Sequence, residues 1–164
     1  MKKKTVILGF LLAVSMVLSY IESALPFAIG IPGVKLGLPN LAVVLLLYTF
    51  GGREAFAVNI MRIVLTGFLF GNLSSILYAA AGAFCSFLAM QCARKTGFFS
   101  IAGISILGGV FHNIGQLLIA MFAVETFAPA FYLPVLLLAG IITGFIIGAV
   151  SARTLPYIKR LVVE

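Results

Sequence analysis

Long apolar segments alternate with short polar breaks along almost the whole chain. Brief clusters of glycine, proline and charged residues separate six apolar segments, at about 5–25, 38–51, 54–71, 73–92, 101–123 and 131–152. A helix needs about 20 apolar residues to cross the roughly 30 Å hydrocarbon core of a bilayer. The pattern therefore predicts an all-α fold, in which residues 1–164 form a single integral membrane bundle of six transmembrane helices.

The connections between these segments differ in length. Pro26–Gly37, between the first two segments, is the longest and is rich in glycine and proline. The second segment is the shortest, and Pro39 near its start suits the first turn of a helix. The first segment follows Lys2–Lys4 as a signal peptide would. It continues to Leu25, however, which favours a retained helix.

Composition supports a membrane protein. Hydrophobic residues make up 63% of the chain and charged residues 9%, and the mean hydropathy is +1.24. Soluble globular domains carry about 25% charged residues, so that class is excluded. The sequence predicts a multi-pass protein of the plasma membrane.

The net charge of +7 would indicate nucleic-acid binding in a soluble protein, but here the positions of the basic residues give another explanation. Loops on the cytoplasmic side of a membrane protein are enriched in lysine and arginine. With a cytoplasmic N-terminus, the inner side carries nine basic residues and the outer side only Lys35; the nine are Lys2, Lys3, Lys4, Arg53, Arg94, Lys95, Arg153, Lys159 and Arg160. We therefore expect both termini inside, Pro26–Gly37 outside, and no nucleic-acid partner.

A stripe of small residues marks the sixth segment. Gly140, Gly144 and Gly148 recur every four residues and so share one helical face. Small residues let helix backbones approach closely in lipid. The stripe is interpreted as internal helix packing, with a docking face for a partner subunit as the alternative.

A charged residue stands in the middle of the third segment. Arg62 follows Asn59 by one helical turn, and a charge at mid-bilayer depth costs at least about 2.5 kcal/mol unless it faces protein or water. Arg62 either pairs with Glu22, near the outer end of the first segment, or binds an anionic ligand group through its planar fork.

The fifth segment carries a second polar group. His112 and Gln116 are four residues apart on one helical face, with Asn113 beside them and Gly108 leaving space one turn earlier. These side chains either clamp neighbouring helices by hydrogen bonds or contact a ligand. His112 is the only histidine, and no second ligand stands at metal-binding spacing, so we expect no metal site.

Together these residues predict a ligand-binding cavity. Ser15, Ser19 and Glu22 share a face of the first segment, while Lys35 and Asn40 lie near the mouth. The cations exceed the single carboxylate, which favours an anionic or zwitterionic small solute.

Several catalytic chemistries are excluded. No Walker A motif is present, and the chain has no aspartate, so no aspartate-rich motif can hold magnesium on a diphosphate. No serine stands in a nucleophile elbow. Cys85 and Cys92 lie about 10 Å apart on one helix, too far for a disulfide, and are interpreted as small apolar fillers. The chain is predicted to be no enzyme, with no catalytic residue and no cofactor.

Four stretches resemble a known family: residues 22–26 (ESALP), 32–40 (PGVKLGLPN), 103–109 (GISILGG) and 112–116 (HNIGQ). They are similar to the Gx transporter family, often labelled heptaprenyl diphosphate synthase component I. Its fold is similar to the substrate-binding S components of energy-coupling-factor (ECF) transporters. Those six-helix proteins capture solutes from outside under a lid formed by the first outer loop.

The resemblance implies roles for particular residues. It gives Lys35 and Asn40 positions in a lid or gate, and Arg62, His112 and Gln116, with Asn113, positions in the pocket. It also implies an ECF-type coupling subunit with two ATPases as partners. S components often meet that subunit through Ala-x-x-x-Ala on the first helix, where this chain has Gly9 and Ala13.

Three functions fit the sequence. The first is a substrate-binding component of a small-solute transporter, surrounded by membrane lipid. The second is an accessory membrane subunit in prenyl-diphosphate or quinone metabolism, working with a soluble prenyl synthase subunit. The third is a structural scaffold in a redox complex.

Overall fold

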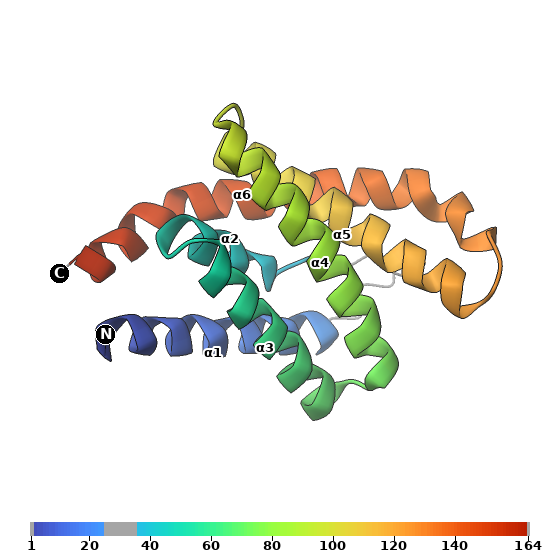
Figure 1. Ribbon diagram of the computed structural model, residues 1–164, viewed down its shortest axis with the longest axis horizontal. Helices are drawn as coiled ribbons and strands as arrows, with labels where there is room; N and C mark the ends of the chain where they lie inside the picture. The colour runs from blue at the N-terminus through green and yellow to red at the C-terminus, as the bar shows by residue number, and fades with distance from the viewer. Residues whose placement is uncertain (1, 25–35, 164) are drawn as a thin grey trace.

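The computed structural model describes residues 2–24 and 36–163, and its regular structure in these ranges is entirely helical (Figure 1). The all-α prediction is confirmed for this part of the chain. The elements are α1 (Lys2–Ala24), α2 (Asn40–Thr49), α3 (Gly52–Phe70), α4 (Leu73–Thr96), α5 (Ile101–Ala123), the short 3-10 helix η1 (Ala128–Tyr132) and α6 (Leu133–Val163).

Local sequence signals define several helix ends. At the start of α4, Ser75 N–H donates to Asn72 Oδ1 at 2.8 Å and Asn72 N–H donates to Ser75 Oγ at 2.9 Å, which forms a capping box. The same helix ends at Gly97, whose φ of +73° suits glycine. Ser100 Oγ then accepts from Gly103 N–H and begins α5.

The last helix is longer than predicted. It continues to Val163, with Pro156 inside it, whereas the apolar segment ends near residue 152. The sequence boundary was placed where charge returns, but a helix does not end because its residues become polar. The turns that carry Lys159 and Arg160 extend beyond the apolar part.

Four stretches in the described residues are long and apolar enough to cross a membrane: 3–24, 73–96, 101–123 and 128–162. They are compatible with a membrane-embedded protein. Helix α2 has only 10 residues, about 15 Å of helix, and α3 is made less apolar by Arg53, Glu54 and Arg62. The count of six spans stays a prediction.

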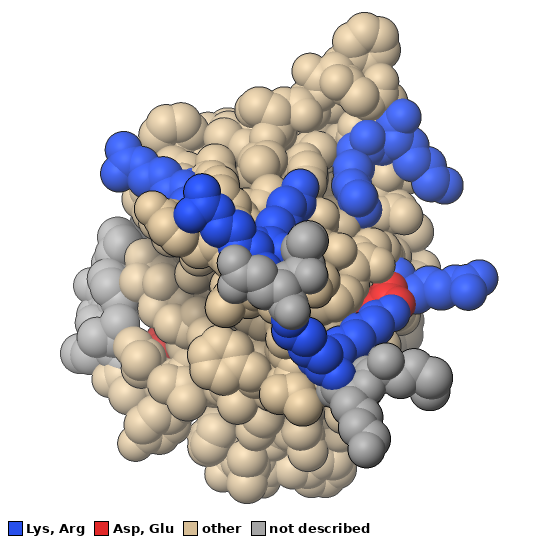
Figure 2. Space-filling model, turned by 90° about the vertical axis from the view of Figure 1, so that its left-hand side faces the viewer, with Lys and Arg blue, Asp and Glu red and all other residues tan. Residues whose placement is uncertain are grey.

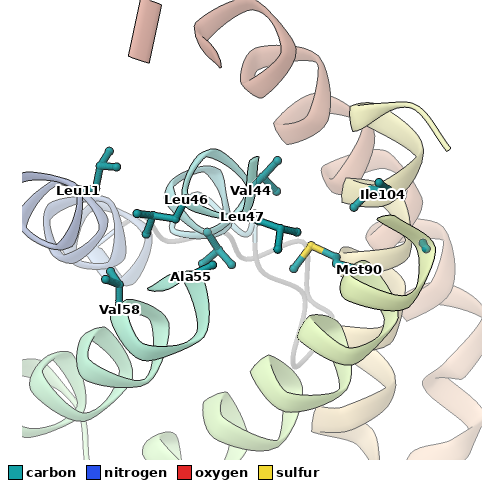
Figure 3. Packing of buried hydrophobic residues seen from close by; sticks show 10 residues of the cluster. Leu11, Val44, Leu46, Leu47, Ala55, Val58, Met90 and Ile104 are labelled. Carbon is teal, nitrogen blue, oxygen red and sulfur yellow. The ribbon is translucent and has the colours of Figure 1, made fainter. Parts of the chain in front are cut away.

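Helix α2 forms the centre of the hydrophobic core rather than a lipid-facing span. Its residues from Ala42 to Leu47 are buried, and it packs against α1, α3 and α6. Figure 3 shows Leu46 and Leu47 of α2 between side chains of the surrounding helices, among them Leu11, Val58, Met90 and Ile104. A short helix is sufficient here, because α1, α3 and α6 surround its apolar side chains.

Glycines bring α5 and α6 into backbone contact. A Cβ added at Gly144 would lie 2.6 Å from Ile106 Cα, and one at Gly140 would lie 2.9 Å from Val110 Cα. Gly148 similarly faces Ala102. The interpretation of the glycine stripe as internal packing is confirmed, and the stripe is therefore covered by α5.

The surface has two distinct parts. Figure 2 shows lysine and arginine side chains gathered over one end of the molecule, where α1 begins and where α4 and α6 end. Lys4 pairs with Glu54 at this end, and the Arg94 guanidinium lies 5.2 Å from the centre of the Tyr48 ring. Large apolar side chains are exposed elsewhere, as at Phe122, which is 82% exposed. This surface suits lipid better than water.

Candidate functional site

Six of the predicted binding residues line one small hollow of about 60 Å³ in the interior of the bundle. They come from α1, α2, α3 and α5, and are Glu22, Asn40, Arg62, His112, Asn113 and Gln116. Asn59 lies behind this wall, in contact with Arg62. Lys35, which the sequence also predicts near the mouth of the cavity, lies outside the described residues.

The Arg62 guanidinium is held inside the bundle by neutral side chains. The residue is only 7% exposed. Its Nε and Nη2 groups donate to Asn59 Oδ1 at 3.1 and 2.7 Å, and Nη1 donates to Ser19 Oγ at 3.1 Å. Ser19 in turn donates to the Ser15 carbonyl. Of the first-segment serines, Ser19 thus lies beside the guanidinium, whereas Ser15 Oγ donates to the Leu12 carbonyl of its own helix.

Glu22 lines the same hollow as Arg62 and joins the end of α1 to the segment before α2. Its Oε1 accepts a hydrogen bond from Gly37 N–H. Gly37 has a φ of +72°, a conformation that favours glycine, and its carbonyl accepts from Asn40 N–H at 2.9 Å. This turn positions Asn40 at the edge of the hollow. Glu22 and Arg62 therefore share one hollow, and the alternatives of pairing with Glu22 or binding a ligand group both stay predictions.

The polar residues of α5 divide between two roles. Asn113 Nδ2 donates to the Leu136 carbonyl of α6 at 2.7 Å, so Asn113 is a clamp between helices as one alternative predicted. His112 packs its ring on the backbone of α4, where a Cβ at Gly82 would lie 2.8 Å from the ring. His112 and Gln116 both face the hollow.

Gly108 does not leave open space above His112, contrary to the sequence interpretation. A Cβ at this position would lie 2.7 Å from Met90 Sδ and 3.3 Å from Ser86 Oγ. The flexible methionine of α4 fills the volume that the glycine leaves, because interiors pack closely wherever a side chain can reach.

Two larger hollows adjoin the polar one. One of about 200 Å³ shares Glu22 and Arg62 with it. The other, of about 560 Å³, shares Asn113 and Gln116 and reaches η1. On the side of the basic end, the space between Ser86, Ser105 and neighbouring residues is only about 10 Å³. The site therefore widens toward the end that lacks the lysine and arginine cluster.

Sequence reasoning missed several polar residues of these larger hollows, among them Thr66, Ser75, Tyr78 and Tyr132. Serine, threonine and tyrosine are common in membrane helices, so their identity alone gave no signal. Ser75 in particular is explained locally by its capping box. Only the packing of α4 against α3 on one side, and against α5 and η1 on the other, assigns these side chains to a cavity.

Metal-binding groups do not gather in the described ranges: no three His, Cys or Glu side chains come together there. Cys85 is half-buried, Cys92 is exposed, and both are free thiols. The arrangement around Arg62 offers hydrogen-bond donors, one imidazole and one carboxylate. These groups can hold a small charged group.

Comparison with known proteins gives a family assignment. A family model described as heptaprenyl diphosphate synthase component I matches residues 11–154. No curated protein and no solved structure matches the chain. The matched range contains every residue that lines the polar hollow, and the resemblance predicted from the sequence motifs is confirmed at the level of the family. The chain belongs to the heptaprenyl diphosphate synthase component I family.

Proposed function

We propose that the protein is the membrane-embedded substrate-binding component of a small-solute transporter, and that it holds an anionic or zwitterionic solute beside Arg62. One observation carries the proposal: Arg62 is buried in an apolar bundle and lines a hollow with polar residues from other helices. Burying a charge within a membrane costs free energy, so charged residues inside membrane helices usually serve a function. The planar guanidinium suits carboxylate and phosphate groups.

The shape of the site favours capture from outside the cell. The hollows widen away from the lysine and arginine cluster, and the positive-inside rule assigns that cluster to the cytoplasm. In this orientation both termini are cytoplasmic, and α2 and α3 complete six crossings, α2 as a shortened one inside the bundle. The plasma membrane is the compartment that fits capture from outside.

Release into the cell requires the tightly packed inner side to open. The chain has no Walker A motif, so we propose that a partner supplies the energy, such as an ECF-type coupling subunit with its ATPases. Binding rather than catalysis is the proposed task, because the chain contains no aspartate and the hollow offers no activated nucleophile.

Co-purified small molecules test this proposal. Wild type, Arg62→Ala and Arg153→Ala would be purified in lipid nanodiscs, and bound compounds would be identified by mass spectrometry. Arg153 is an exposed arginine outside the hollow and serves as the matched control. We expect an anionic or zwitterionic compound with wild type and Arg153→Ala that is lost in Arg62→Ala. The same compound at the same occupancy in all three would remove Arg62 from the site.

The family description favours a second candidate function, an accessory subunit of prenyl-diphosphate synthesis. In this case the protein would hold a lipid-like substrate at the membrane for a soluble synthase subunit. Reconstitution tests it: product should form faster with the pair in nanodiscs than with the soluble subunit and empty nanodiscs. Equal rates, together with uptake of a labelled solute into vesicles, would favour the transporter.

A further inference from the structure

Two hollows of opposite character meet at the same two residues. The smaller one, about 60 Å³, contains Arg62 and His112, and has room only for a small charged group. The larger one, about 560 Å³, is lined mainly by apolar groups. Asn113 and Gln116 line both, so they mark the boundary between a polar and an apolar compartment.

A compact polar solute would make use of only one of the two hollows. Such a solute would have to fit the smaller volume, and the apolar one would stay unused. The larger hollow runs between α4, α5, η1 and the start of α6, where Leu117, Ala120 and Leu136 supply apolar walls. Tyr78 and Tyr132 offer aromatic surface with a polar edge.

We propose that the solute is an amphiphile, with one small anionic head group at Arg62 and His112 and an apolar tail along the hollow between α4, α5 and η1. This inference rests on the proposed function, since it names the class of solute that the same site takes. Asn113 is fixed at the boundary by its hydrogen bond to the Leu136 carbonyl. Leu136 itself also lines the larger hollow. The head is thereby separated from the tail at a defined depth.

A chain-length series tests the proposal. Protein in nanodiscs would be titrated with octyl phosphate and octanoate, and with the nearly tail-less ethyl phosphate and acetate, with empty nanodiscs subtracted for partitioning. Each buried methylene contributes about a three- to fourfold gain in affinity. The two forms of each head group differ by six methylene groups, so we expect the eight-carbon form of at least one head group to bind on the order of 1,000-fold more tightly than its short counterpart.

Two variants locate the tail. Ala120→Phe fills the larger hollow and should remove most of the chain-length gain while short anions still bind. Ala13→Phe makes the same substitution at an exposed site of α1, away from the hollows, and should leave the gain intact. Tyr132→Ala widens the hollow and should shift the preferred tail to a longer one. This variant tests the position of the tail independently if Ala120→Phe does not fold.

The outcomes separate this inference from the proposed function. Equal affinities for long and short anions, both lost in Arg62→Ala, would overturn the amphiphile and leave the solute-binding role standing. Tail-dependent binding that Ala120→Phe and Ala13→Phe change equally would place the tail in the bilayer, and would also overturn the inference. Anion binding that is absent, or that is unaffected by Arg62→Ala, would overturn the proposed function itself.

Discussion

Arg62 donates two hydrogen bonds to one acceptor, the side-chain oxygen of Asn59, one turn earlier in α3. The contact uses one edge of the guanidinium, at Nε and Nη2. The opposite side, at Nη1, donates to Ser19 of α1, which lines the adjoining hollow of about 200 Å³. Asn59 does not line the hollow, so it acts by orienting the cation.

Asn59→Ala should therefore weaken solute binding without touching the solute. We expect a five- to tenfold loss of affinity and a loss of about 1–3 kcal/mol in the free energy of unfolding, because a buried charged donor loses its acceptor. Solute titration and thermal unfolding in nanodiscs measure both. Asn72→Ala, at the exposed cap of α4, should lower stability by about 1 kcal/mol and leave affinity unchanged. Unchanged affinity in Asn59→Ala would contradict the orienting role.

Gly144→Ala should destabilise the bundle. Its Cβ would meet Ile106 Cα at 2.6 Å and Ser105 O at 2.7 Å, and backbone atoms cannot move aside as side chains can. We expect a loss of about 1–3 kcal/mol in the free energy of unfolding. Gly9→Ala is the control, since nothing lies within 4 Å of the added methyl group. Alanine is the better helix former, so this variant should be neutral or more stable by up to about 1 kcal/mol.

Gly82→Ala should affect the site more than the fold. The added methyl group would meet the His112 ring at 2.8 Å, and the ring must turn or shift toward the hollow. We expect solute affinity to fall at least tenfold, measured by titration. Gly103→Ala, whose Cβ would make an ordinary contact of 3.5 Å with Phe99, should bind normally. Equal affinities in the two variants would show that the position of His112 is unimportant for binding.

The proposed orientation is testable by labelling. Phe98 precedes α5 at the basic end, and Phe127 lies beside η1 at the other end; their side chains are 91% and 83% exposed. In a background with Cys85→Ser and Cys92→Ser, each would be replaced by cysteine. A membrane-impermeant maleimide should label Phe127→Cys in intact cells, and Phe98→Cys only after lysis. The reverse pattern would place the hollows on the cytoplasmic side.

The sequence predicted the grouping of the polar residues because an apolar chain leaves few places for them. Glu22, Arg62 and His112 lie in largely apolar helices, and all three avoid lipid by lining the same hollow. The Met90 side chain that fills the space at Gly108 was not predictable, since it depends on how α4 packs on α5. The buried position of α2 was also not predicted, because the sequence of a short apolar helix has the same pattern in a protein core as in a membrane.

The backbone contact between α5 and α6 would limit how the proposed transporter could open. Helices separated by a layer of flexible side chains can slide, but those that touch through glycine have no such layer and must move as one body. In the proposed transporter, relative motion would then fall to the contact between α1 and α3, where Arg62 donates a hydrogen bond to Ser19. A solute that competes for this hydrogen bond would weaken the contact between α1 and α3, and would so favour movement of these two helices relative to each other.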